Sequence, residues 1–142
     1  MKKIVLTALP ISFIVCIAAA QDLKSGDVPR DVKSAVARRY PDAKRVHWEK
    51  EKGNYEANWG GKSGEDNSAS FTPSGEVVEI VKAIEIRQLP APVAVYVTKN
   101  YHGLKIKEAG RVTTASGQTM YEAEIKGGDL LFDEKGNFIR KD

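Results

Sequence analysis

The sequence predicts an α+β protein in which a unit of one helix and four antiparallel strands occurs twice. Three observations support this fold class. Sequence features recur at an offset of 61 residues, each copy begins with an amphipathic helix, and after each helix the spacing of apolar residues changes from about four to two. We therefore expect one antiparallel sheet of about eight strands with both helices on one face.

The internal repeat divides the chain into two units. Its anchor pairs are Val36 and Val97, Tyr40 and Tyr101, Phe71 and Phe132, and Gly75 and Gly136. Tyr55-Glu56-Ala57 recurs as Tyr121-Glu122-Ala123 at an offset of 66, so the first hairpin of the second unit should be longer. We assign residues 28–86 to the first unit and residues 87–142 to the second, which together form one compact domain. Residues 21–27 form a short N-terminal segment before them.

One helix is predicted at the start of each unit. The first should cover residues 29–40, and the second should run from residue 90 or 92 to residue 101. Their apolar stripes are Val32, Val36 and Tyr40 in the first helix and Val93, Val97 and Tyr101 in the second. Residues four apart lie on one helix face, so each stripe can bury itself against a sheet.

Four strands should follow each helix. They are expected at residues 46–49, 55–59, 69–71 and 76–86 in the first unit, and at residues 105–112, 120–126, 129–132 and 137–140 in the second. Apolar and polar residues alternate in most of them, which is typical of strands with one buried face. Lys52-Gly53-Asn54 is the expected turn of the first hairpin.

The first 20 residues have the pattern of a secretory signal peptide. Two lysines precede an uncharged run at residues 4–20 that ends in three alanines. This order of features directs export, and it predicts cleavage between Ala20 and Gln21. A membrane anchor is the alternative, but 17 uncharged residues interrupted by a proline are short for a membrane span. We expect a periplasmic or secreted protein without a stable membrane anchor after cleavage.

Composition excludes two further classes of function. Cys16, the only cysteine, lies inside the predicted signal peptide, so the exported chain should have no disulfide and no thiol chemistry. Without residues 1–20 the chain has 20 basic and 19 acidic residues, with both signs interspersed. Nucleic-acid binding needs a basic face, so we expect no nucleic-acid partner.

Polar residues of the alternating strands should gather on the sheet face that the helices leave uncovered. Such a face is a candidate for binding, although solvated polar faces also occur without a function. The glycine-rich loop at residues 60–67 borders it. The predicted binding surface consists of His47, Glu49, Glu51, Gly53, Asn54, Glu56, Asn58, Trp59, Glu122 and Glu124.

Two tryptophans have no aromatic counterpart in the second unit. Trp48 and Trp59 either pack at the junction of the units or are exposed as anchors for a partner, because tryptophan is enriched at binding hot spots. The tendency of large aromatic side chains to be mostly buried favours packing.

No catalytic, metal or cofactor site is predicted. His47 and His102 stand alone, without an H-E-x-x-H motif or a paired ligand spacing. Motifs of serine nucleophiles and of phosphate-binding loops are absent from the sequence. Glu56, Glu122 and Glu124 could supply an acid and a base, but the repeat explains Glu56 and Glu122 more simply. We predict that the protein is not an enzyme.

Four motifs in the first unit carry a family resemblance. They are V-P-x-x-V-x-x-A-V-x-x-x-Y-P at residues 28–41, Trp48-Glu49, Tyr55-Glu56-Ala57 and Phe71-x-x-x-Gly75-Glu76-Val77-Val78. Together they resemble the PepSY-like family of exported bacterial proteins, described as β-lactamase-inhibitor-like, over residues 28–142 in two copies. The resemblance implies a tandem helix-and-sheet unit, a periplasmic or secreted location, and binding or inhibition of an extracytoplasmic protein or enzyme.

Two features depart from the secreted β-lactamase inhibitor that gives the family its label. That inhibitor is stapled by disulfides, and a hairpin that imitates the drug should carry a carboxylate, which Lys52-Gly53-Asn54 lacks. We therefore predict a noncatalytic protein-binding or inhibitor-like module without assigning its target. The alternative is a small-ligand or envelope-polymer binding protein that uses the same face. The sequence does not name the partner. It leaves the oligomeric state open as well, because edge strands can pair between chains.

Overall fold

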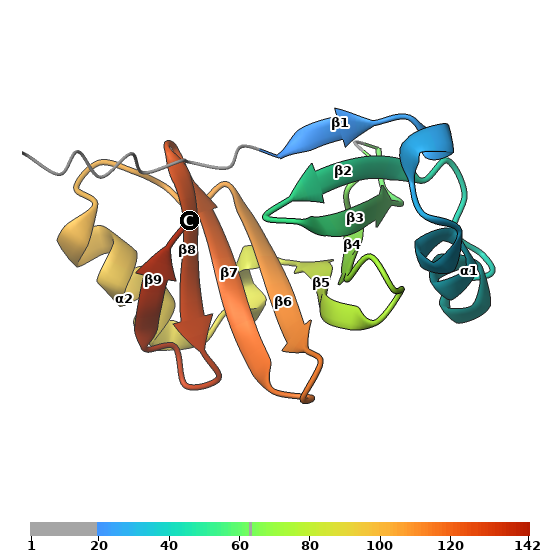
Figure 1. Ribbon diagram of the computed structural model, residues 1–142. Coiled ribbons are helices and arrows are strands. Elements are labelled where there is room, and N and C mark those ends of the chain that lie inside the picture. The colour runs from blue at the N-terminus through green and yellow to red at the C-terminus, as the bar shows by residue number, and fades with distance from the viewer. Residues whose placement is uncertain (1–19, 63) are drawn as a thin grey trace, which may run out of the picture.

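The computed structural model describes residues 20–62 and 64–142. In this part of the chain, nine strands form one antiparallel sheet in chain order, and two α-helices pack on it (Figure 1). The strands are β1 (Gln21–Leu23), β2 (His47–Glu51), β3 (Asn54–Trp59), β4 (Asn67–Phe71), β5 (Val77–Ile84), β6 (Glu108–Thr114), β7 (Thr119–Ile125), β8 (Gly128–Asp133) and β9 (Phe138–Lys141). The helices are α1 (Arg30–Arg39) and α2 (Ala91–Asn100), each preceded by a short 3-10 helix, η1 (Ser25–Asp27) or η2 (Ile86–Gln88).

The N-terminal prediction falls mostly outside the described residues. Of the expected signal peptide only Ala20 is described, and Cys16 lies outside as well. The first element is β1, which begins at Gln21, the residue after the expected cleavage position. Among residues 20–62 and 64–142, neither helix has the length and apolar character that a membrane crossing requires.

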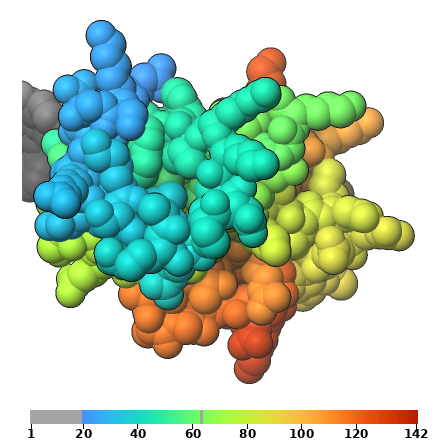
Figure 2. Space-filling view, turned by 90° about the vertical axis from the view of Figure 1, so that its right-hand side faces the viewer, coloured from blue at the N-terminus to red at the C-terminus, as the bar shows by residue number. Residues whose placement is uncertain are grey.

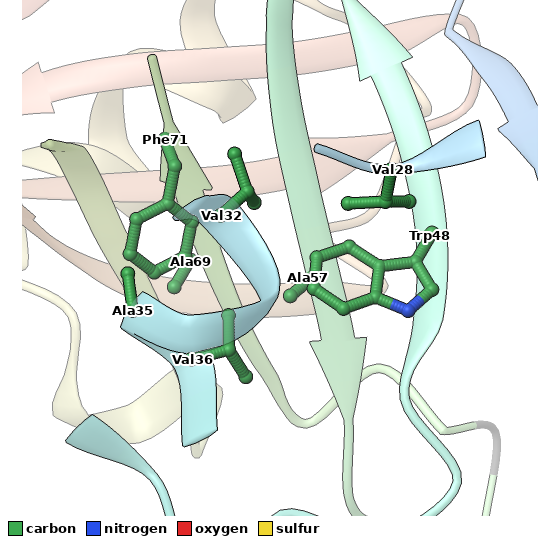
Figure 3. Close-up of a cluster of buried hydrophobic side chains, with 8 residues drawn as sticks. All are labelled: Val28, Val32, Ala35, Val36, Trp48, Ala57, Ala69 and Phe71. Atoms are coloured by element: carbon green, nitrogen blue, oxygen red, sulfur yellow. The ribbon is translucent and has the colours of Figure 1, made fainter. Parts of the chain in front are cut away.

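Helix α1 covers the first half of the sheet with the face that its apolar spacing predicts. Val32 is fully buried and Val36 nearly so, because residues four apart project from one side of a helix. Figure 3 shows both valines beside Phe71 and the Trp48 ring. Figure 2 looks onto this end of the molecule, where residues of the first unit (blue to green) lie in front and the second unit (orange to red) shows at the lower edge.

Helix α2 repeats this arrangement on the second half of the sheet. Val93 and Val97 are buried in a second cluster with Phe132 and Leu130. The Tyr96 ring stacks on Phe138 with 4.6 Å between the ring centroids. The two units therefore have separate cores on a shared sheet.

Both helices lie on the same face of the sheet. Two rows of paired residues show this: Ala57, Ala69 and Ile80 on β3 to β5, and Ile84, Ala109 and Ala123 on β5 to β7. Ile80 and Ile84 are four residues apart on β5, and an even spacing places side chains on one face of a strand. Ala57 belongs to the α1 core and Ala123 to the α2 core. The predicted arrangement is confirmed, with nine strands where about eight were expected.

The additional strand is β1, and it extends the repeat toward the N-terminus. Leu23 of β1 pairs with Trp48. At an offset of 61 residues, Ile84 of β5 pairs with Ala109. The 3-10 helices η1 and η2 follow at the same offset. The sequence indicated residues 21–27 only as an N-terminal segment. In the structure they occupy the same place in the first unit that the end of β5 and η2 occupy in the second.

Two repeated glycines allow the last turn of each unit to approach its own helix. Gly75 has a φ of +83°, and a Cβ atom there would lie 2.8 Å from the carbonyl oxygen of Asp31 in α1. Gly136 has a φ of +84°, and its Cβ atom would lie 2.9 Å from Cβ of Pro90. Residues other than glycine rarely adopt a positive φ, because their Cβ atom clashes with the backbone. Glycine is therefore required at both positions by the conformation and by the space.

The sheet twists strongly, so the strands of the two units cross (Figure 1). In this view β2 and β3 run across the picture, whereas β6, β7 and β8 run up and down. The twist brings the β2–β3 hairpin toward the C-terminal end of the described chain, where Nζ of Lys52 lies 4.0 Å from Oδ1 of Asp142. The uncovered face is consequently concave, and residues of both units line one cavity in it.

The two cores should make similar contributions to stability. Phe71 and Phe132 are both fully buried, so Phe71→Ala and Phe132→Ala should each lower the free energy of unfolding by about 3–5 kcal/mol. Urea denaturation followed by circular dichroism measures this loss. Ile139→Ala is the control, because Ile139 is 44% exposed and its loss should be below about 1 kcal/mol. A similarly small loss at either phenylalanine would contradict the assignment of two cores.

Candidate binding face and its acidic recess

Strand pairing places most of the predicted binding residues together on the uncovered face. Glu49 pairs with Glu56 across β2 and β3, and residues two apart follow on the same side. The row continues from Glu56 through Ser70 to Glu79 on β5. The predicted residues whose strand positions face this side are His47, Glu49, Glu51, Asn54, Glu56, Asn58, Glu122 and Glu124. Gly53 lies in the β2–β3 turn beside them.

The two tryptophans lie on the opposite, helix-covered face. Trp48 is 6% exposed and belongs to the α1 core. Trp59 is at an odd-numbered position of β3, as Ala57 is, and its ring lies 4.6 Å from the Tyr40 ring, centroid to centroid. Packing is thus the role of both tryptophans in the structure. Trp59, which was expected in the binding surface, is separated from that surface by the sheet itself.

A recess in the uncovered face gathers carboxylates from both units. Glu56 on β3, Glu79 on β5, Glu122 on β7 and Asp129 on β8 line a cavity of about 350 Å³, and Arg140 on β9 lines it too. We call these five residues and the space between them the acidic recess. Sequence reasoning named Glu56 and Glu122, and the structure brings both to one site.

Sequence reasoning missed the other three recess residues. Glu79 interrupts an apolar stretch at residues 77–81, and a lone charge in an apolar strand was an available signal for a functional position. Asp129 and Arg140 stand near strand ends and carry no such signal. Their place in the recess follows only from the order of the strands and the twist of the sheet.

Burial and mutual repulsion disfavour ionisation in the recess. The pKa of Glu122 is raised to about 7, chiefly because burial removes its hydration and then because Asp129 and Glu79 are nearby. Burial is also the main cause that raises the pKa of Glu79, and of Asp129. The pKa of Glu56 is raised by burial too, against the opposing effect of the Ser68 hydroxyl, which donates a hydrogen bond to Glu56.

Basic groups near the recess are engaged elsewhere. Nε of Arg140 donates to Oδ1 of Asp142 at 2.9 Å, and Nζ of Lys52 lies 3.2 Å from Oε1 of Glu51. Among the described residues, no ion pair within 4.0 Å reaches any of the four recess carboxylates. Carboxylates therefore outnumber the basic side chains in this cavity, which Lys52 and Arg140 supply, and the excess of negative charge favours an additional cationic group.

A second cluster lies at the outer edge of the uncovered face. Nε2 of His47 lies 3.1 Å from Oδ1 of Asp22 and 3.6 Å from Oε1 of Glu49. These residue types are metal ligands, and their ligand atoms all lie within 4.8 Å of one another. Sequence reasoning predicted no metal site, because His47 stands in no metal-ligand motif. Asp22 is 25 residues before His47 and lies on β1, a strand that was not expected.

One family model matches the chain twice, over residues 18–62 and residues 58–140. Its description reads "Putative beta-lactamase-inhibitor-like, PepSY-like". The chain belongs to this PepSY-like family. The resemblance drawn from the helix and strand motifs is thereby confirmed. No curated protein matches the sequence.

Solved structures from Bacteroides share the PepSY-like fold. A protein of Bacteroides eggerthii, described as "putative periplasmic", has a TM-score of 0.66 at 22% identity, covering 81% of this chain and 88% of that one. A DUF2874 family protein of Bacteroides uniformis has a TM-score of 0.63 at 22% identity over 80% and 88%. A BLIP-like protein of Bacteroides fragilis has a TM-score of 0.56 at 17% identity over 80% and 85%. At these identities the similarity shows the fold alone.

Replacing Glu122 by glutamine should stabilise the PepSY-like domain increasingly as the pH rises. The pKa of Glu122 is about 7 in the folded protein and 4.5 without the environment of the fold. Between these values the folded state keeps a proton that the unfolded state has released, so the wild type loses stability as the pH rises. Glutamine stays neutral, so the variant should gain about 1–3 kcal/mol over the wild type across this range and no more above it.

Urea denaturation at several pH values from 4 to about 8 measures this difference. Glu134→Gln removes the same charge from an exposed residue of the β8–β9 turn, and it should show no such trend. A pH-independent difference between Glu122→Gln and the wild type would contradict the raised pKa.

Proposed function

We propose that this protein is an exported, noncatalytic, inhibitor-like module that binds another extracytoplasmic protein through the uncovered face. One observation carries the proposal: both units contribute to a single concave face that the helices leave free. Residues of β3 and β5 from the first unit and of β7 to β9 from the second line the same recess. Membership of the PepSY-like, inhibitor-like family supports this use of the face.

The charge of the recess indicates the chemistry of the partner. Four carboxylates with raised pKa values and no ion-pair partner among the described residues favour a lysine or arginine side chain from outside. A cation placed between them would restore their ionised forms and replace the hydration that burial removes. Ion pairs at the centre of an interface contribute more to affinity than ion pairs at its solvent-exposed rim. We therefore place the partner's basic residue in the recess.

The absence of catalysis is part of the same proposal. A raised pKa such as that of Glu122 occurs in catalytic acids, but covalent catalysis also requires an activated nucleophile. The Ser68 hydroxyl bonds to Glu56, yet Ser68 is only 9% exposed, which supports a structural hydrogen bond. In the described chain, His47 lies at the outer edge of the face and does not line the recess.

Export is proposed through a signal peptide that is cleaved after Ala20. The order of charged, apolar and small residues in the first 20 positions supports it. The first strand begins at Gln21, so cleavage at this position would leave the described fold whole. The similar protein of Bacteroides eggerthii, which is described as "putative periplasmic", also supports a location outside the cytoplasm.

A second candidate function is binding of a small ligand or an envelope polymer on the same face. The volume of the recess, about 350 Å³, lies within the range of small-molecule sites. Its charged lining favours a cationic ligand over an apolar one. A partner protein and a small ligand can be distinguished by crosslinking.

Site-specific crosslinking should capture a partner from the uncovered face and not from the helix face. A photo-crosslinking amino acid at Glu51, whose side chain is 41% exposed, lies beside the recess. The same amino acid at Lys99, which is exposed on α2, is the matched control. Irradiation of cells that export the chain, followed by mass spectrometry, should give one major adduct from the first position only.

The variant Glu56→Gln/Glu122→Gln should then lose most of this adduct while keeping its circular dichroism spectrum. Asp42→Asn/Glu134→Gln removes two carboxylates at exposed positions and should keep it. Equal adducts from Glu51 and Lys99, or full capture by the recess variant, would contradict the proposed surface. A recess that binds a small cation without any protein adduct would favour the second candidate.

A further inference from the structure

We infer that Asp22, His47 and Glu49 form a binding site for a divalent transition-metal ion of the zinc class. The site lies on β1 and β2, at the outer edge of the uncovered face. It is independent of the acidic recess and of any partner bound there.

Strand pairing fixes the three positions on one face. Asp22 and Glu49 are direct partners in the β1–β2 ladder. His47 precedes Glu49 by two residues on β2, so its side chain leaves the sheet on the same side. A histidine and two carboxylates are therefore held as neighbours by backbone hydrogen bonds, and no loop has to close to assemble the set.

The distances between the ligand atoms fit one ion. A tetrahedral site with bonds of about 2.0–2.1 Å holds its ligand atoms about 3.3 Å apart. Nε2 of His47 lies 3.1 Å from Oδ1 of Asp22 and 3.6 Å from Oε1 of Glu49. The first separation is slightly shorter than the tetrahedral value, and the second is slightly longer. The remaining separation, between the two carboxylate oxygens, is within 4.8 Å, and a rotation of the exposed Asp22 side chain can shorten it.

The donor set selects the class of metal. Calcium and magnesium prefer oxygen ligands only, whereas an imidazole beside carboxylates suits zinc and its neighbours among the transition metals. The side chains of His47 and Asp22 are 49% and 83% exposed. A fourth position on the ion would thus be open to water or to a ligand from outside.

Direct pairing of the His47 ring with the two carboxylates is the competing explanation of the cluster. The repeat argues against a purely structural role, because the equivalent positions in the second unit hold Ala83, Glu108 and Gly110. The same strands form there without the ligand set, so the fold does not require it. Asp22 is the member of the set on β1, so a bound ion would tie that edge strand to β2.

Zinc titration of the purified protein tests the site. The chain is produced from its full sequence, purified after export, stripped of metal by a chelator and titrated calorimetrically with ZnCl₂. A Cys16→Ser background removes the single thiol as a competing ligand in any unprocessed chain. We expect binding of one ion per chain, with calcium and magnesium failing to compete.

Variants and ring resonances locate the ion. Loss of an outer-shell partner typically weakens metal binding by about 10–100-fold. His47→Asn and Asp22→Asn each remove a direct ligand, so each should weaken zinc binding by at least that factor. His102→Asn removes the other histidine of the sequence and should bind zinc as the wild type does. Zinc should also shift the NMR signals of the His47 ring and leave those of His102 in place.

Three results would overturn the inference: no zinc binding by the wild type, equal weakening by His102→Asn, or a shift confined to the His102 ring. The NMR titration uses the unmutated binding site, so it decides the matter even where a variant folds poorly. Because no protein partner takes part, failure of this test leaves the crosslinking result of the binding face unaffected.

Discussion

The pairing of β5 with β6 joins the two units into one sheet, and the other features of the molecule depend on it. Six residue pairs, from Glu79 with Thr114 to Ile84 with Ala109, align the faces of the two units. Both helices therefore come to one side, and the polar residues of both units come to the other. Without this alignment Glu56 and Glu122 would belong to unrelated surfaces, and no recess would form between them.

The recess shows how a sheet can hold groups that repel one another. Backbone hydrogen bonds fix the positions of Glu56, Glu79 and Glu122, and their carboxylates share a confined space with Asp129. The cost of this arrangement is offset by the two hydrophobic cores on the opposite face, which bury Phe71 and Phe132 completely. The hydrophobic cores and the proposed binding face thus lie on opposite sides of the sheet, and a cation bound in the recess would reduce the repulsion between its carboxylates.

Sequence reasoning predicted the parts of the fold that depend on local periodicity. Spacing of four and two gave both helices and most strands, because these patterns reflect one buried face. It also placed Glu56 and Glu122 on the uncovered face. Asp129 and Arg140 required the strand order and twist, which no local pattern contains. Strand β1 was missed because three residues are too few to show a period, and the cluster at His47 was missed with it.

Strand β1 has a consequence for the repeated architecture as a whole. Each unit offers its last strand to the first strand of the next, as β5 does to β6, and head-to-tail contacts of this kind build an open polymer unless their rotation closes a ring. An unoccupied edge at β2 would be a template for the last strand of another copy. Leu23 pairs with Trp48 in the register that Ile84 uses with Ala109. A strand of three residues therefore terminates, at this edge, a sheet that could otherwise grow into a polymer.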